Sequence, residues 1–377
     1  MRSRLLPLLA MLLLLGGAAQ AARIVGTERT DRLVGTPGPD TLLGLGGADR
    51  LFGLGGADVL DGGPGRDLLD GGPGADRIAA QYDGARDVVR CGGGADIVNA
   101  DLADAVAGSC ELVGRRLSRD PYTDPESQHE TQVEPDSATN GRTTVAAFQV
   151  GRRFDGAATN IGFAVTTDAG TTWRSGLLPR LTVAGRPPGP NARASDPVVA
   201  YDAATGTWLI ATLAIEGAVS RLTVSRSSDG FSWSAPIVAA EASSASGIAF
   251  DKEWITCDNG TTSPHRGTCY LVYTDVLRRD SLGVVTSTDG GTTWSTPAQA
   301  PVTDIVGAIP VVRPGGDVVV IYLWRGRSIG SSVSADGGAT FSAPSLVADL
   351  QARPARGLRF FPLPAADLHP DGRVWVT

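Results

Sequence analysis

An aspartate recurs at every ninth residue in the first third of the chain, and this spacing could build a metal site. Asp31 begins the series in a degenerate unit, and after Asp76 the series resumes with a shift of two residues. Carboxylate oxygens are hard ligands, and Ca²⁺ takes about six to eight oxygen ligands. The spacing therefore predicts several calcium ions bound by the following side chains: Asp40, Asp49, Asp58, Asp67, Asp76, Asp87 and Asp96.

Glycine and one aliphatic residue keep the same nine-residue phase. Five consecutive units from Gly35 carry glycine at position 4, aspartate at position 6 and an aliphatic residue at position 8: GTPGPDTLL, GLGGADRLF, GLGGADVLD, GGPGRDLLD and GGPGADRIA. The pattern resembles the RTX (haemolysin-type) calcium-binding nonapeptide G-G-x-G-x-D-x-U-x over Gly26 to Val98. The resemblance implies a parallel β-roll in which each Ca²⁺ is shared between turns. Aspartates two units apart, such as Asp40 and Asp58, would then line one stack.

The charge of this segment predicts that it folds only with a cation. Arg23 to Gly114 holds 15 acidic and 8 basic residues, and the resulting −7 equals the net charge of the whole chain. One aliphatic residue per unit gives a thin core, and unneutralised carboxylates repel one another. Folding is therefore expected to be coupled to calcium binding. The alternative, a flexible glycine-rich linker, is disfavoured because linkers do not keep aspartate and leucine in phase.

The N-terminus has the pattern of a secretory signal peptide, residues 1–21. Arg2 and Arg4 precede an apolar run from Leu5 to Leu15, and Ala19-Gln20-Ala21 supplies a cleavage site. A membrane anchor is disfavoured because it needs about 20 apolar residues. The expected location is extracellular, with no membrane span. The acidic balance, 33 Lys+Arg against 40 Asp+Glu, also argues against nucleic acid as a partner.

The four cysteines form two close pairs in the sequence, as expected for an exported protein with disulfides. Zinc is disfavoured because there is no C-x-x-C spacing and the three histidines are far apart. The expected bridges are Cys91–Cys110 and Cys257–Cys269. The expected domains are a calcium-binding roll at 22–114, a polar linker at 115–128 and a second domain at 129–377.

Four related motifs punctuate the last two-thirds of the chain: TTDAGTTW at 166–173, SSDGFSW at 227–233, STDGGTTW at 287–294 and SADGGATF at 334–341. They resemble the Asp box S-x-D-x-G-x-x-W of the sialidase superfamily (BNR repeats). The resemblance implies an all-β fold, a sialidase-like six-bladed β-propeller with one box per four-stranded blade. Serine and aspartate would bond backbone amides of a tight hairpin, a structural role. The residues that define the boxes are Asp168, Trp173, Asp229, Trp233, Asp289, Trp294, Asp336 and Phe341.

The repeat places strands around the boxes and accounts for about four and a half blades. The first three strands of each blade are expected near 130–134, 143–150 and 161–166; 197–201, 207–214 and 221–226; 253–257, 269–274 and 282–287; and 309–312, 318–324 and 329–333. A fifth blade would begin at Phe360 and reach its second strand at Arg373 to Val376. Because a propeller ring needs closure, we expect either a further C-terminal portion or another chain that supplies it.

The boxes lie on the face opposite the predicted ligand face, which carries mixed charge suited to a polar, anionic or sugar ligand. By the strand layout this rim holds His129, Glu130, Arg152, Arg153, Asp155, Asp196, Glu216, Asp251, Lys252, Glu253, Asp275, Arg278, Arg279, Asp280, Arg325, Arg327 and Arg359. Sialidases clamp the substrate carboxylate with three arginines and use a tyrosine nucleophile, a glutamate and an aspartate acid/base. The matching catalytic candidates are Asp155, Glu216 and Arg152.

Two functions of different classes stand at this point. The first is a secreted calcium-binding protein whose propeller recognises a glycan or a cell-surface polymer. The second is an exo-α-sialidase-type hydrolase that cleaves terminal sialic acids. The strand that should carry the first clamp arginine reads Gln128 to Val133 without arginine, which favours the binding protein. The commonest activity of the superfamily favours the hydrolase, so the sequence leaves the question of catalysis open.

Overall fold

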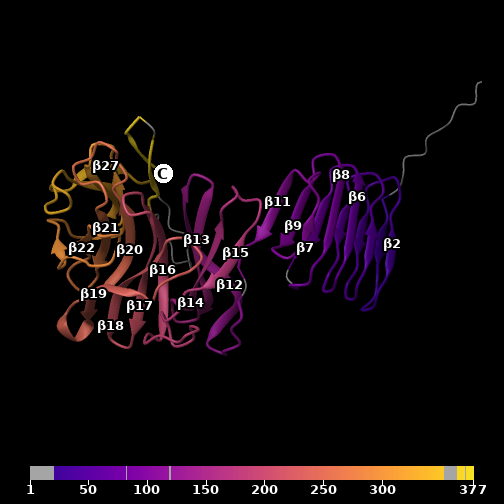
Figure 1. The fold of residues 1–377 in the computed structure, drawn as a ribbon, viewed down its shortest axis with the longest axis horizontal. Helices are drawn as coiled ribbons and strands as arrows, with labels where there is room; N and C mark the ends of the chain where they lie inside the picture. Colours follow the sequence, from indigo (N-terminus) through magenta and orange to yellow (C-terminus); the bar gives the residue numbers. More distant parts are fainter. Residues whose placement is uncertain (1–20, 82, 119, 352–362, 370) are drawn as a thin grey trace, which may run out of the picture. The chain divides into compact units, whose positions relative to one another are not determined.

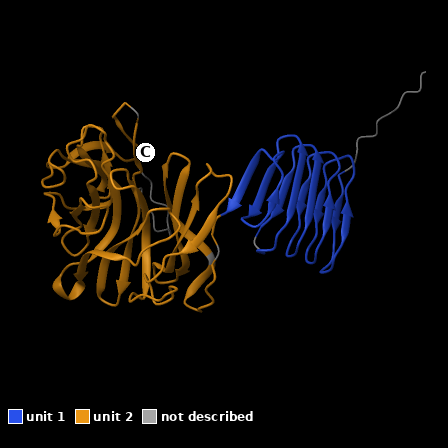
Figure 2. Ribbon diagram, in the orientation of Figure 1, with its two compact units in different colours: residues 1–116 blue, residues 117–377 orange. Residues whose placement is uncertain are grey.

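The computed structural model describes residues 21–81, 83–118, 120–351, 363–369 and 371–377. The chain divides into two compact units, residues 1–116 and residues 117–377 (Figure 2). The predicted signal peptide lies outside the described residues, apart from Ala21. In the described ranges the structure is all-β with one short 3₁₀ turn, Ser244–Ser246. No helix in these ranges is long and apolar enough to cross a bilayer.

The first unit is a parallel β-roll of two facing sheets (Figure 1). Two nonapeptides make one coil, so neighbouring strands of a sheet are 18 residues apart, as in the pairing of Leu42 with Leu60. One sheet has the order β1(Arg23–Val25), β3(Thr41–Leu43), β5(Val59–Asp61), β7(Arg77–Ala80), β9(Ile97–Asp101), β11(Leu112–Arg116). The other has the order β10(Ala105–Val106), β8(Val88–Gly93), β6(Leu68–Pro73), β4(Arg50–Phe52), β2(Arg32–Val34).

The core of the roll is the column of aliphatic residues at position 8 of the repeat. Leu42, Leu51, Leu60 and Leu69 are fully buried, and Ile78, Val89 and Val98 continue the column. Cys91 is buried in the same core and is bonded to Cys110. The predicted roll fold and this disulfide are therefore confirmed.

The last strand of the roll runs past the expected boundary at residue 114. Arg115 and Arg116 pair with Ala100 and Asp101 of β9, because the parallel ladder continues to the end of its partner strand. At the other end of the expected linker, Ser127 and Gln128 already belong to the first strand of the second unit. The segment between the two strands is therefore shorter than the predicted 115–128.

The second unit is a propeller-type domain, which confirms the predicted fold class. Its described residues form four antiparallel blades of four strands in chain order, each called a sheet below, with a box in each turn between the third and fourth strands. The pairing of Ala158 with Ala194 joins the first two blades into one eight-stranded sheet. The sheets are β12(Ser127–Asn140), β13(Thr143–Arg153), β14(Ala158–Thr166), β15(Arg174–Leu177); β16(Arg193–Asp202), β17(Thr207–Glu216), β18(Val219–Ser227), β19(Ile237–Ser243); β20(Phe250–Cys257), β21(Cys269–Asp275), β22(Ser281–Ser287), β23(Ala298–Gln299); and β24(Ile305–Val312), β25(Val318–Trp324), β26(Ser328–Ser334), β27(Ser345–Asp349).

Apolar side chains fill the space between successive sheets. One core cluster joins Leu209 and Leu222 of the second sheet to Tyr273 and Val285 of the third. The disulfide Cys257–Cys269 links the paired ends of β20 and β21, as expected from the sequence.

A two-stranded hairpin of β28(Ala366–Leu368) and β29(Val374–Val376) follows the fourth sheet. Val374 and Val376 pack against Val319, Ile321 and Ile329 of that sheet. The strand predicted for Arg373 to Val376 is thus present. The expected start of a fifth blade at Phe360, and the rim residue Arg359, lie outside the described residues.

Candidate functional site

Carboxylates of the roll form two rows, one along each line of turns. Each aspartate accepts a hydrogen bond at Oδ1 from a backbone amide one coil earlier, which belongs to Ala22 for Asp40 and to an aspartate for the others. Asp40 donates to Asp58 at 2.7 Å, and Asp58 donates to Asp76 at 2.9 Å. In the other row Asp49 donates to Asp67 at 2.7 Å, and Asp67 donates to Asp87 at 2.8 Å. The structure therefore brings together the aspartates that lie two units apart.

Both rows continue beyond Asp87 and Asp96, where the sequence repeat is lost. Asp87 donates to Asp104 Oδ1 at 2.9 Å, and Asp96 donates to Glu111 Oε2 at 3.0 Å. Sequence reasoning missed these two acids because the step along each row, 18 residues and then 20 at the shift, shortens here to 17 and 15 residues. A constant step would have pointed to Ala105 and Gly114 instead.

The second carboxylate oxygens of the rows suit calcium. Oδ2 is buried without a hydrogen-bond partner in the described structure for Asp49, Asp58, Asp67, Asp76 and Asp96. A Cβ placed on Gly53 would lie 2.4 Å from Asp58 Oδ2 and 2.5 Å from the carbonyl oxygen of Gly71. Carboxylate and carbonyl oxygens thus converge where glycine leaves room, and both are ligands that Ca²⁺ prefers.

Electrostatics shows why these carboxylates need a cation. Burial, and then the neighbouring carboxylates, raise the pKa of Asp67 and Asp76 to about 6 and that of Asp87 to about 7. In the described ranges no three His, Cys, Asp or Glu side chains converge into a ligand cluster. Backbone carbonyls would therefore have to complete each coordination shell. Bound calcium would neutralise the carboxylates and join successive coils.

In the propeller, the first strand of each four-stranded blade carries a β-bulge at the same position. Two residues oppose one on the partner strand, and the first of the two has a left-handed backbone. These left-handed residues are Glu134 (φ 52°), Asp196 (φ 47°), Lys252 (φ 50°) and Gly307 (φ 66°). Such backbone is unusual for residues other than glycine. The bulges turn these positions toward a cavity of about 330 Å³ that the four first strands line, called the central cavity below.

Lys252 forms salt bridges with two other bulge residues, Asp196 and Glu134. Its Nζ lies 2.8 Å from Asp196 Oδ1 and 3.7 Å from Glu134 Oε1. Gln149 donates a hydrogen bond to Glu134 Oε2 and lies 3.1 Å from Ser195 Oγ. Burial, and then Asp196, raise the pKa of Glu134 to about 7. Burial opposes the charge of Lys252, but Asp196 and Glu134 outweigh it and raise the pKa of the ammonium.

Glu253, the second residue of the third bulge, is a buried carboxyl group in the wall of the central cavity. Its exposed fraction is 1%, and neither carboxylate oxygen accepts a hydrogen bond from another described residue. Burial, and then Asp196, raise the pKa of Glu253 well above its ordinary value. Asp136 lines the same cavity and accepts a hydrogen bond from the Val199 amide at 2.7 Å.

Two of the three predicted catalytic residues, Asp155 and Arg152, line a smaller cavity of about 210 Å³, called the side cavity below. The two cavities share Glu134, Asp196 and Lys252 in their walls. Glu216, the third candidate, is an exposed residue at the end of β17 and lines neither cavity. The structure therefore brings Asp155 and Arg152 together but leaves Glu216 apart.

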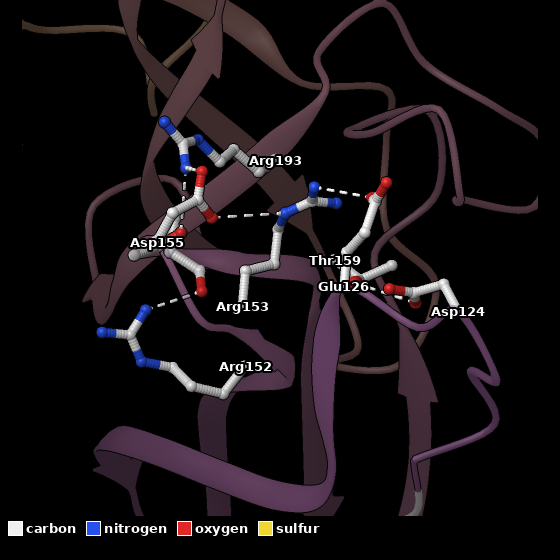
Figure 3. Close-up of polar contacts among 9 residues, drawn as sticks. Asp124, Glu126, Arg152, Arg153, Asp155, Thr159 and Arg193 are labelled. Carbon is white, nitrogen blue, oxygen red and sulfur yellow. Dashed lines mark hydrogen bonds and ion pairs between the residues drawn. The ribbon is translucent and has the colours of Figure 1, made fainter.

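Asp155 is held by arginines (Figure 3). Arg193 Nη1 lies 2.7 Å from Asp155 Oδ2, and Arg153 Nε lies 3.7 Å from Oδ1. A small desolvation effect is outweighed by Arg193, and the pKa of Asp155 is lowered. A carboxylate of lowered pKa is poorly suited to donate a proton. Arg152 Nη1 donates to the carbonyl oxygen of Ala157 at 2.7 Å.

The predicted rim contained Asp196, Lys252 and Glu253 but missed Glu134 and Arg193. Both missed residues lie within strands, whereas the prediction considered loop ends. A sequence signal could have identified Glu134, because a proline inside a strand often marks a bulge. Glu134-Pro135 and Asp196-Pro197 are two such cases in equivalent strands.

The boxes close the turns at the opposite ends of the strands from the side cavity. In the third box, Asp289 Oδ1 accepts from the Ser287 hydroxyl at 2.8 Å and from the Thr293 amide at 2.9 Å. Trp294 Nε1 donates to the carbonyl oxygen of Gly291 at 3.2 Å. The Ser/Thr–Asp bond recurs at Asp168, Asp229 and Asp336. Trp173 and Trp233 repeat the indole bond, and Phe341 packs in a core cluster without it.

A family model for the BNR repeat-like domain matches residues 141–366, more than half of the chain. The chain belongs to this family. The RTX calcium-binding nonapeptide repeat also matches the BNR repeat-like protein, at residues 25–60 and 52–80. Both resemblances expected from the sequence are therefore confirmed. Among curated proteins the chain matches none.

Solved structures similar to this BNR repeat-like protein include sialidases and an arabinanase. A Hadza microbial sialidase, Hz136, is 18% identical over 56% of this chain and 46% of its own, with a TM-score of 0.42. The intramolecular trans-sialidase from Ruminococcus gnavus is 15% identical over 59% and 72%, with a TM-score of 0.45. An α-L-arabinanase from Penicillium chrysogenum is 14% identical over 68% and 76%, with a TM-score of 0.47. The aligned part covers about half the length of Hz136 and of a leech intramolecular trans-sialidase.

Proposed function

We propose that the protein is secreted, binds several calcium ions in its roll, and recognises a saccharide or a saccharide-bearing surface polymer through the central cavity. The observation that carries the proposal is Glu253, a buried carboxyl group without a partner in the wall of that cavity. A buried polar group left without a hydrogen bond costs about 1–3 kcal/mol. A hydroxyl-bearing ligand would relieve that cost.

The composition of the cavity supports a sugar ligand. Carboxylates and an ammonium stand beside apolar surface from Trp254, Val198 and Ile309. Sugars present hydroxyl groups at their rim and C–H groups on their faces, so they need both kinds of wall. Binding sites commonly combine an apolar lining with a few fixed polar groups.

The direct test measures binding by the full chain in millimolar calcium on a glycan array, followed by calorimetry with each glycan that binds. Glu134→Gln should weaken binding about tenfold because it removes a charged wall group. Glu241→Gln is the matched control, since Glu241 is an exposed glutamate paired with Arg221 and lines neither cavity. Equal affinity of the two variants would contradict the central cavity as the site.

A glycoside hydrolase is the second candidate, and one observation favours it. Glu253 has a raised pKa and shares the central cavity with Glu134 and Asp196. Glycosidases pair a protonated carboxylic acid with a second carboxylate. Turnover of 4-nitrophenyl glycosides or a fluorogenic sialoside by the full chain, abolished in Glu253→Gln, would support this candidate. Glycan binding without turnover of any of these substrates would reject the hydrolase and support the binding function alone.

A further inference from the structure

The two cavities contain more acid than base, and this imbalance bears on the class of saccharide that fits. Their walls hold six carboxyl groups and three basic groups: Glu134, Asp136, Asp155, Asp196, Asp251 and Glu253 against Arg152, Arg193 and Lys252. A ligand with a negative charge would enter a site that already has a surplus of acid. A ligand with a positive charge would meet carboxylate oxygens that no basic group of the cavity walls contacts, as at Glu253.

Each of the basic groups is already bonded within the protein. Arg193 bonds Asp155 at 2.7 Å and the carbonyl of Gly156 at 3.3 Å. Arg152 bonds the carbonyl of Ala157 at 2.7 Å, and Lys252 bonds Asp196 at 2.8 Å. A clamp on a carboxylate needs a guanidinium with its donors free for bidentate contact. Both arginines use Nη1 in these bonds, so a carboxylate clamp that includes Nη1 would have to displace them first.

Among the acids, Glu253 has acceptors to offer. Both its oxygens are buried without a partner from another described residue, and Trp254 adjoins it in the wall of the cavity. Burial raises the pKa of Glu253 and so favours the neutral acid, which can donate one hydrogen bond to a ligand oxygen. Beside an ammonium group it can ionise, because an adjacent opposite charge favours the charged form.

From these contacts we infer that the cavity selects saccharides without acidic groups, and prefers those that carry a free amine, such as unacetylated hexosamines. The inference rests on the proposed saccharide-binding function and specifies its ligand class. Glu253 is the group that pairs with the amine. The expected order of affinity is amino sugar, then neutral sugar, then sialylated sugar.

The test uses the full chain in saturating calcium, because free carboxylates of the roll would attract any cationic ligand. Chitotetraose and its fully deacetylated counterpart are compared by calorimetry at two salt concentrations. Array glycans with and without terminal sialic acid are compared in parallel. The inference expects the deacetylated chain to bind about tenfold more tightly than chitotetraose, and terminal sialic acid to weaken binding.

Glu253→Gln separates this cavity from binding elsewhere on the acidic chain. It should reduce the ratio of the two chitotetraose affinities by about tenfold. Glu253→Leu, which leaves no buried polar group without a partner, provides a second variant should Glu253→Gln fold poorly. An unchanged ratio in the folded variants overturns the inference, as does tighter binding of the sialylated glycans. Failure of every glycan to bind overturns the proposed function itself and the inference with it.

Discussion

Lys252 Nζ lies 2.8 Å from Asp196 Oδ1, and the two residues occupy the same bulge position in neighbouring sheets of the propeller. The contact follows from the repeat, because equivalent backbone positions of the first strands line the same central cavity and here carry residues of opposite charge. Glu134, at the equivalent position of the first sheet, completes the group.

Removal of Lys252 should destabilise the propeller. Lys252→Met keeps the aliphatic stem but leaves Asp196 and Glu134 facing each other without a cation. Because the lysine side chain is 26% exposed and Asp196 only 9%, the expected loss is about 1–3 kcal/mol in the free energy of unfolding. Urea unfolding measures it. The double variant Lys252→Met/Asp196→Asn should recover most of the loss, and a single variant as stable as the wild type would contradict the prediction.

The pH dependence of stability should report on Glu134. Burial and Asp196 raise the pKa of Glu134 from 4.5 to about 7. A raised pKa means that the folded state favours the protonated acid. The stabilisation of the folded state by protonated Glu134 is complete below about pH 4.5 and is lost as the pH rises through about 7. Glu134→Gln, always neutral, should gain thermal stability relative to the wild type over that range. A difference in melting temperature that does not change with pH would refute it.

Substitution in a carboxylate row should raise the calcium requirement of the roll. Asp58 supplies an unpartnered buried oxygen, so Asp58→Asn removes a charged ligand. The calcium concentration at half-maximal folding, followed by circular dichroism of the full chain, should rise roughly tenfold or more. Asp61→Asn is the matched control because Asp61 is exposed and lies three residues away on β5. Identical calcium titrations of both variants would exclude Asp58 as a ligand.

Loss of an Asp box should affect stability and leave ligand binding unchanged. Asp289→Ala removes the acceptor for Ser287 and for the Thr293 amide and hydroxyl. The expected cost is about 1 kcal/mol in the free energy of unfolding, comparable to the loss of a capping residue. Glycan affinity at a temperature where the variant is folded should equal that of the wild type. A large loss of affinity without loss of stability would assign the box a functional role.

Repeated features were predictable from the sequence because they depend on local chemistry. Asp and Leu in nine-residue phase were enough to predict the roll, and Asp168 or Asp289 in a box marked the turn between two strands. The bulges were not predicted, because they depend on how a strand pairs with its neighbour. Glu134 therefore became a candidate only with the structure, which shows the first strands converging, and Glu253, already in the predicted rim, was not distinguished there from the other rim charges. Glu216 illustrates the reverse: its loop position was plausible, but β17 carries it away from both cavities.

The 18-residue step of the roll makes its length adjustable. The coils from Asp40 to Asp76 share the same amide-to-carboxylate bond and one buried aliphatic residue per unit, so one more pair of nonapeptides would find a matching surface on either side. Stability of such arrays grows roughly by a constant increment per repeat. Each duplication would lengthen the roll by one strand spacing, about 4.8 Å. An in-frame duplication of 54 nucleotides would therefore change the number of calcium sites without changing the propeller sequence.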